Sequence, residues 1–152
     1  MKQKLDENFV AENVQKIFEG LAVSATVEVS RQENIFFVDI SSPDSALLIG
    51  KHGINLESLQ FILAVRLKTQ TGRDDFEIFI DIGGWRKQRE EHLKQMVLSI
   101  ANQVAASQKA QSLYNLRSSE RRLIHMTLAD NPKVATASEG DGSERHLIIK
   151  PK

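Results

Sequence analysis

Apolar residues in the first part of the chain predict one helix followed by two strands. They recur at helical spacing through residues 5–19, and Gly20 follows where such a helix would end. Residues 25–29 alternate in the manner of a strand, and residues 34–41 are rich in β-branched and aromatic side chains. Because only a short polar turn separates them, the two strands are predicted to form a hairpin.

The next apolar segments predict two helices and a third strand. A short helix that Asp44 would cap ends at Gly50, and a longer helix with a strongly apolar face extends to about residue 70. Residues 76–82 have the composition of a strand. Since the chain reaches this strand from residues 34–41 across two helices, these two strands are expected to be parallel.

A pair of glycines, Gly83-Gly84, marks the predicted start of a second unit. An amphipathic helix is predicted at residues 85–108. The elements expected after it are a strand at 112–116, a helix at 118–129 that Ser118 would cap, and strands at 134–138 and 146–149. The pattern therefore predicts an α+β protein of two small domains, at residues 1–84 and 85–152.

The composition excludes several classes of protein. Hydrophobic residues make up 41% of the 152-residue chain, which is enough to bury a core in one domain or in two small ones. The apolar runs are too short to span a membrane, and the N-terminus lacks the apolar segment of a signal peptide, so we expect a cytoplasmic protein. The absence of cysteine excludes disulfides, thiolate zinc sites and a cysteine nucleophile.

The charge is unevenly distributed along the chain although its sum is zero. Residues 1–82 contain 8 Lys or Arg and 13 Asp or Glu, a balance of −5, whereas residues 83–152 contain 12 and 7, a balance of +5. An acidic first unit can bind a nucleic acid only through a local basic feature. The second unit can attract a polyanion over a broader face.

Patterns typical of catalytic and metal sites are missing from the sequence. The four histidines have neither the i, i+4 spacing nor the cysteine partners of a metal site. The acidic pairs Asp74-Asp75 and Glu90-Glu91 would diverge at a turn or on a helix, which is unsuited to acid–base catalysis. There is also no Gly-x-Ser-x-Gly elbow and no Walker phosphate-binding loop. We therefore expect no enzyme activity, metal or cofactor.

The loop Gly50-Lys51-His52-Gly53, between two predicted helices, is the first candidate binding site. Two glycines permit positive φ angles in a sharp turn, and Asn55 is expected to cap the second helix. Free backbone amides, the positive end of that helix and Lys51 would then face one small volume that suits a phosphate. Taken alone, Gly-x-x-Gly favours an ordinary turn between helices, so the neighbouring elements decide between the two interpretations.

The predicted helix at 118–129 carries the second candidate site. Arg121 and His125 are four residues apart, and hence on one helical face, where both can donate to one phosphate. Arg122, together with Arg145 and Lys150 near the last strand, ranks second as a phosphate contact. In the alternative interpretation, Arg121 pairs with a carboxylate and His125 is half-buried under the sheet.

The order of elements in the first half resembles a known domain. Helix, strand, strand, helix, Gly-x-x-Gly, helix, strand is the order of a prokaryotic-type (type II) KH domain. The pentapeptide Ile49-Gly50-Lys51-His52-Gly53 is similar to the loop of that domain.

The second half resembles the R-three-H domain, named for its Arg-x-x-x-His motif. The motif that carries this resemblance is Glu120-Arg121-Arg122-Leu123-Ile124-His125, followed by Val134-x-Thr136-x-Ser138-x-Gly140 and then Arg145. The two domains in this order resemble the bacterial Jag family, also called KhpB or SpoIIIJ-associated, over nearly the whole chain.

The resemblance implies a non-enzymatic protein that binds single-stranded RNA in post-transcriptional regulation. In the KH family the loop grips the backbone of about four nucleotides and an apolar groove holds the bases. The site residues that this implies in the first domain are Gly50, Lys51, His52 and Gly53, with Ile49, Ile54 and Leu59 lining the groove. Those implied in the second domain are Arg121, His125, Arg122 and Arg145. Single-stranded DNA is the alternative ligand.

A second hypothesis is a protein-interaction scaffold. The acidic KH domain would then bind a partner, and the resemblance implies that this is a small KH protein. Only the R-three-H domain would contact nucleic acid. The chain departs from the family at Asn115 and Ser118, where prolines are frequent, which is expected to alter the turn before the helix. It also does not match the additional N-terminal domain of many Jag proteins.

Overall fold

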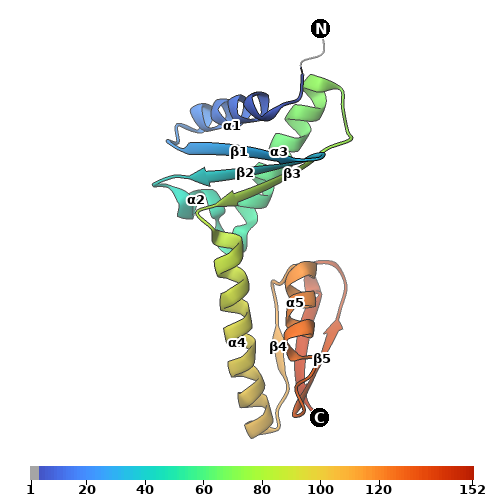
Figure 1. The fold of residues 1–152 in the computed structure, drawn as a ribbon. Coiled ribbons are helices and arrows are strands. Elements are labelled where there is room, and N and C mark those ends of the chain that lie inside the picture. Colours follow the sequence, from blue (N-terminus) through green and yellow to red (C-terminus); the bar gives the residue numbers. More distant parts are fainter. Residues whose placement is uncertain (1–3) are drawn as a thin grey trace. The chain divides into compact units, whose positions relative to one another are not determined.

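The computed structural model describes residues 4–152, which form two compact units. The division falls between Arg86 and Lys87, inside the helix α4. Each unit has its own helices, sheet and apolar core (Figure 1). Residues 1–3, which belong to the segment tested above for a signal peptide, lie outside the described residues.

The first unit contains three helices, three strands and one short 3-10 turn within the described residues. They are α1 (Glu7–Leu21), β1 (Thr26–Gln32), β2 (Ile35–Ser41), α2 (Ser45–Ile49), the 3-10 turn η1 (Lys51–Gly53), α3 (Ile54–Thr71) and β3 (Glu77–Ile82). The order in the sheet is β1-β2-β3. As expected from the connections, β1 and β2 are antiparallel whereas β2 and β3 are parallel, with Phe36 opposite Ile78.

Alternation along the strands places the core of this unit on one face of the sheet. Phe36, Val38 and Ile40 of β2 are buried, and so are Ile78, Ile80 and Ile82 of β3. Apolar side chains of α1 and α3 complete the same cluster. The core therefore fixes α3, and with it the loop at its start, against the sheet.

The second unit packs two helices on one face of an antiparallel sheet. Its elements are α4 (Trp85–Ser107), β4 (Gln111–Leu113), α5 (Ser118–Leu128), β5 (Val134–Glu139), the 3-10 turn η2 (Gly142–Glu144) and β6 (His146–Pro151). The strand order is β4-β6-β5. Leu147 and Ile149 of the central strand are fully buried among apolar residues of α4 and α5. The α+β class predicted from the sequence is thus confirmed.

The helix caps predicted at Asp44 and Ser118 are wrong. Asp44 makes no side-chain hydrogen bond to the start of α2, and its own N–H donates to Ser42 Oγ at 3.1 Å. Arg117, not Ser118, precedes the first turn of α5, and its N–H donates to Glu120 Oε2 at 3.0 Å. In both cases a nearby side chain, Ser42 or Glu120, accepts the backbone hydrogen bond at the helix start. The presence of a capping residue in the sequence does not show which side chain makes this bond.

Some strand limits also differ from the prediction. Strand β1 continues to Gln32 because it pairs with β2 along its whole length. Strand β4 ends at Leu113, and Asn115 then takes a left-handed backbone conformation with φ 57° that interrupts an extended chain. Strand pairing and a left-handed backbone conformation leave no trace in the hydrophobic pattern. The ends of β1 and β4 could therefore not be predicted from it.

No helix within residues 4–152 is long and apolar enough to cross a membrane. Over the same residues, no cluster of His, Asp or Glu has the arrangement of a metal site.

Candidate nucleic-acid interface

The Gly50-Lys51-His52-Gly53 loop makes a tight connection between α2 and α3. Gly50, His52 and Gly53 have positive φ angles of 71°, 54° and 80°. Glycine is required at position 50 for a second reason, because a Cβ there would lie 2.6 Å from Cγ of Asn55. Lys51 and His52 are exposed, so the turn presents their side chains to solvent.

Asn55 does not cap α3, contrary to the prediction. Gly53 occupies the cap position, and Asn55 lies within the first turn. Its Nδ2 instead donates to the carbonyl of Leu47 at 2.8 Å. The amide side chain therefore joins α2 to α3 across the loop, which accounts for its close contact with Gly50.

Two of the loop amides are used within the chain. The N–H of Gly50 donates to Ala46 O at 3.0 Å, and that of Gly53 donates to Gly50 O at 3.2 Å. These two groups are not the free donors that the sequence suggested. Lys51 and His52, whose side chains are exposed, are the residues of the loop that can reach a phosphate.

An apolar groove lies beside the loop. It has a volume of 660 Å³, and the residues that line it are Lys16, Ile17, Gly20, Leu21, Val23, Leu47, Leu48, Asn55, Ser58, Leu59 and Ile62. Three of its apolar residues are open to solvent: Leu21 is 56% exposed, Leu47 66% and Ile62 52%. Exposed aliphatic side chains around a concave surface mark a binding groove more often than isolated surface residues do.

The three apolar residues proposed for base contacts occupy different places. Leu59 lines the apolar groove. Ile49 is partly buried against the core, and Ile54 is 61% exposed without belonging to the groove lining. The sequence did not indicate Leu21, Leu47 and Ile62, because their exposure follows only from how α1, α2 and α3 meet.

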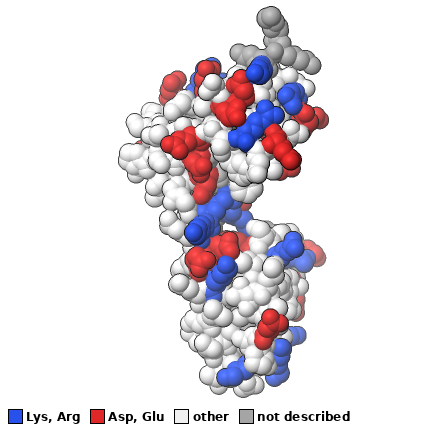
Figure 2. Space-filling model, in the orientation of Figure 1, with Lys and Arg blue, Asp and Glu red and all other residues white. Residues whose placement is uncertain are grey.

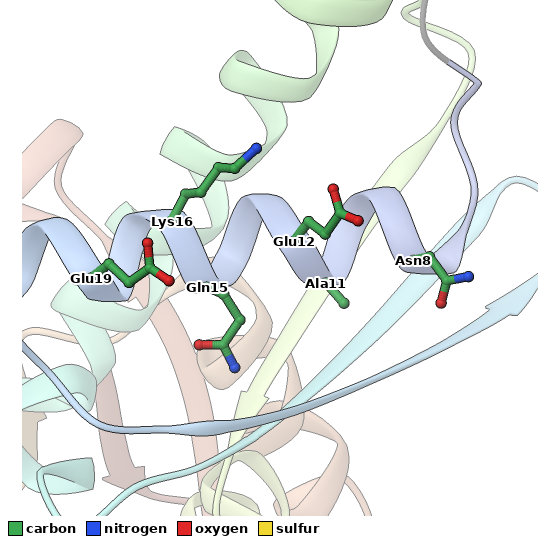
Figure 3. Close-up of a pocket in the computed structure, with 6 residues that line it drawn as sticks. All are labelled: Asn8, Ala11, Glu12, Gln15, Lys16 and Glu19. Carbon is green, nitrogen blue, oxygen red and sulfur yellow. The ribbon is translucent and has the colours of Figure 1, made fainter.

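The outer face of α1 is polar and carries more negative than positive charge. Asn8, Ala11, Glu12, Gln15, Lys16 and Glu19 line a shallow hollow there. Figure 3 shows their side chains projecting from successive turns of the helix. Two carboxylates against one ammonium group make this hollow unfavourable for a phosphate.

Arginine side chains converge at a hollow in the second unit. The residues that line this arginine hollow are Ser118, Arg121, Arg122, His125, Met126, Ser138 and Arg145, and its volume is 620 Å³. It brings together all four residues of this unit that the sequence singled out as site residues. Arg122, which ranked second as a phosphate contact, lines it too. Three guanidinium groups and no carboxylate border the hollow, so it favours an anion.

Hydrogen bonds within the unit hold Arg121 and His125. Arg121 Nη1 donates to Leu116 O at 2.6 Å, and Nη2 donates to Ser118 Oγ at 3.0 Å. The ring nitrogens of His125 lie 2.6 Å from Thr136 Oγ1 and 3.0 Å from Ser138 Oγ. The half-buried imidazole thus connects α5 to β5. Arg122 and Arg145 are better placed to meet a ligand, since no such pair of short hydrogen bonds holds either guanidinium.

Glu120 explains why the arginine hollow contains no carboxylate. Its Oε1 accepts a hydrogen bond from Arg89 Nε of α4 at 2.8 Å, and its Oε2 accepts from the N–H of Arg117. The Glu120 side chain is only 8% exposed. Its carboxylate is therefore used to fix the start of α5 and does not enter the hollow.

Ser118 and Ser138 line the arginine hollow, although the sequence did not single them out as binding residues. Both hydroxyls border the arginine hollow. The spacing of Thr136 and Ser138 on one face of a strand was the available signal, because residues two apart in a strand share a face.

Comparisons with known proteins identify the domain of the second unit and the family of the chain. A family model of the R-three-H domain matches residues 91–151, which include the whole arginine hollow. The chain is 30% identical over 153 residues to a protein of Clostridium symbiosum named RNA-binding protein KhpB, covering 99% of this chain and 68% of that protein. It is 33% identical to RNA-binding protein KhpB of Bacillus subtilis, covering 91% of this chain and 67% of that protein.

A third relative, RNA-binding protein KhpB of Lactiplantibacillus plantarum, is 31% identical over 88% of this chain and 41% of its own length. The second unit thus carries an R-three-H domain. The chain as a whole belongs to the KhpB family. This confirms the family resemblance drawn from the two motifs.

Proposed function

We propose that this protein is a non-enzymatic binder of single-stranded RNA that holds the RNA backbone at two places. The observation that carries the proposal is the arginine hollow, in which Arg121, Arg122 and Arg145 meet without a carboxylate among the lining residues. Guanidinium groups bind phosphate through paired, charge-assisted hydrogen bonds. The names of the relatives, RNA-binding protein KhpB, support RNA as the ligand.

The first unit supplies the second place of contact. We assign residues 1–84 to a type II KH domain and residues 85–152 to an R-three-H domain. In the KH domain, Lys51 and His52 would contact phosphates, while the adjacent apolar groove, which includes Leu59, would receive bases. Because this unit is acidic overall, binding of a polyanion there depends on local positive charge such as that of Lys51. Binding of this kind would suit a role in post-transcriptional regulation.

Salt dependence of binding tests this function. Neutralising about four phosphates of a single strand predicts that the logarithm of the affinity falls against the logarithm of salt concentration with a slope of about −3. Fluorescence anisotropy of a labelled, unstructured RNA at several salt concentrations measures the slope. Absence of binding, or affinity that does not change with salt, would refute the proposal. The same oligomer made as DNA distinguishes the two nucleic acids.

The polar face of α1 motivates the alternative function, a protein-interaction scaffold. Glu12 and Glu19 border the hollow in Figure 3, and the −5 balance of residues 1–82 repels a polyanion outside the loop. In this alternative the KH domain binds a partner protein, such as a small KH protein, and the R-three-H domain alone contacts nucleic acid. The two functions differ in whether the loop at Lys51 contributes to RNA affinity.

A further inference from the structure

The sheet of the second unit has one face that no helix of this unit covers. Residues alternate along the strands, and Leu147, Ile149 and Val134 face the core under α4 and α5. The opposite side, named the open sheet face here, is formed by the residues between them. Its members are Ser112, Ala135, Ala137, Glu139, His146, Ile148 and Lys150, with Tyr114 directly after β4.

Two rings are stacked at one end of the open sheet face. The centroids of Tyr114 and His146 lie 4.6 Å apart, with an angle of 23° between the ring planes. Tyr114 is 54% exposed, so one side of the pair faces solvent. The Nδ1 atom of His146 lies 2.9 Å from Glu144 O, which fixes the imidazole in this orientation.

On the two outer strands, the residues in the middle of this face are small. Ser112 and Ala137 flank Ile148 of the central strand, and Ala135 lies opposite Lys150. No long side chain of β4 or β5 rises between the stacked rings and Lys150. If one base stacks on Tyr114, the small residues leave space for the next base of the same strand over the sheet.

Lysines gather at the other end of the open sheet face. Lys109 and Lys133 lie just before β4 and β5, and Lys150 and Lys152 lie at the end of the antiparallel β6. The N–H of Lys152 donates to Lys133 O at 3.0 Å, which holds these two residues together. The connections that join this end of the sheet contain one carboxylate, Asp130. Figure 2 shows basic side chains gathered at the end of the second unit that carries the C-terminus in Figure 1.

From this arrangement we infer that the open sheet face is a second single-strand contact in the R-three-H domain, where bases stack on Tyr114 and phosphates meet the lysines. The inference rests on the proposed function. Base stacking on aromatic side chains tolerates any sequence, and lysines attract the polyanionic backbone. Along β6, His146 and Lys150 are four residues, or roughly 13 Å, apart. The face is distinct from the arginine hollow, because Ser138 of the hollow faces α5 whereas its neighbour Ala137 faces the opposite way.

Glu139 places a negative charge at the aromatic end of the open sheet face. It lies opposite His146 in the β5–β6 pairing, so its carboxylate is at the aromatic end. Phosphates are repelled there and attracted at the lysine end, so the backbone is expected to lie over the lysines. Replacing Glu139 with Gln is expected to strengthen RNA binding.

The test compares Tyr114→Ser with Tyr114→Phe in the full chain. The ligands are an unstructured RNA and a base-free oligomer of the same length, in which every residue is abasic. Loss of the ring is expected to weaken binding of the complete RNA about tenfold. Tyr114→Phe keeps the ring and should bind as the unchanged protein does, and neither substitution should alter binding of the base-free oligomer.

Equal binding of the complete RNA by the Tyr114→Ser variant and the unchanged protein would overturn the inference while the proposed function stands. Absence of RNA binding by the unchanged protein would overturn both. Should Tyr114→Ser fail to fold, NMR of the unchanged protein decides. Ring protons of Tyr114 and His146 should shift upfield with the complete RNA and not with the base-free oligomer, and ring signals that do not respond to either ligand would contradict stacking.

Discussion

Replacing both Arg122 and Arg145 with Glu is expected to weaken binding of single-stranded RNA roughly 100-fold or more. Both side chains border the arginine hollow, and reversing their charge turns two attractive contacts with phosphate into repulsion. Arg121 and His125 are left unchanged because their hydrogen bonds to Leu116, Ser118, Thr136 and Ser138 support the fold of the unit. Anisotropy titration at fixed salt concentration measures the loss.

A matched control for this variant is Lys87→Glu with Lys94→Glu. It makes the same change in net charge on α4, away from the residues that line the hollow. We expect it to retain most of the affinity, because neither lysine lines the hollow. Lys94 forms ion pairs with Glu90 and Glu91, so circular dichroism must first show that α4 is intact. If both double variants lose the same affinity, the arginine hollow is not a specific site.

Replacing Lys51 and His52 with Asp is expected to weaken RNA binding about tenfold or more while the protein stays folded. The Lys51 ammonium group supplies positive charge at the loop, in a unit whose net charge is negative. The fold should tolerate the change because both positions are exposed, and Asp readily adopts the left-handed conformation that His52 has at φ 54°. Circular dichroism checks the fold, and anisotropy checks the affinity.

Lys68→Asp serves as the control for Lys51→Asp, since each replaces one exposed lysine with the same residue. Lys68 lies in the last turn of α3, roughly 20 Å along the helix from the loop. It should leave RNA affinity nearly unchanged. Unaltered affinity of the loop variant would instead favour the scaffold function, in which the R-three-H domain alone contacts nucleic acid.

The elements of both units were predictable from sequence because their apolar periods are strong. Residues 34–41 are mostly β-branched or aromatic, which favours a strand. Because side chains alternate along a strand, about half of them were expected to face a core. The parallel pairing of β2 with β3 followed from the two helices between them, which allow the chain to cross the sheet. Arg121 and His125 could be placed on one face for the same kind of reason, since helical spacing determines it.

Side-chain partners were less predictable because they depend on neighbours distant in sequence or on competing acceptors nearby. Asn55 is a common capping residue, yet its amide found the carbonyl of Leu47, eight residues earlier. Likewise, His125 meets Thr136 and Ser138 only because β5 returns beside α5. Arg122 and Arg145 lie in different segments of the chain, so the hollow that both line could not be predicted from either segment alone.

The exposed groove of the first unit illustrates the same limit. Leucines at 21 and 47 read as core residues in any hydrophobic pattern, whereas the structure leaves both more than half exposed. Exposure arises where α1, α2 and α3 meet without filling the space between them. A pattern of apolar residues shows which side chains can be buried and not which of them will be.

We expect one RNA strand to contact both the loop and the arginine hollow, and a double-mutant cycle tests this expectation. RNA affinity is measured for the unchanged protein, for Lys51→Asp with His52→Asp, for Arg122→Glu with Arg145→Glu, and for the fourfold variant. If both sites hold the same strand independently, the losses multiply, to roughly 1,000-fold in the fourfold variant. A fourfold variant no weaker than the arginine variant alone would contradict this expectation.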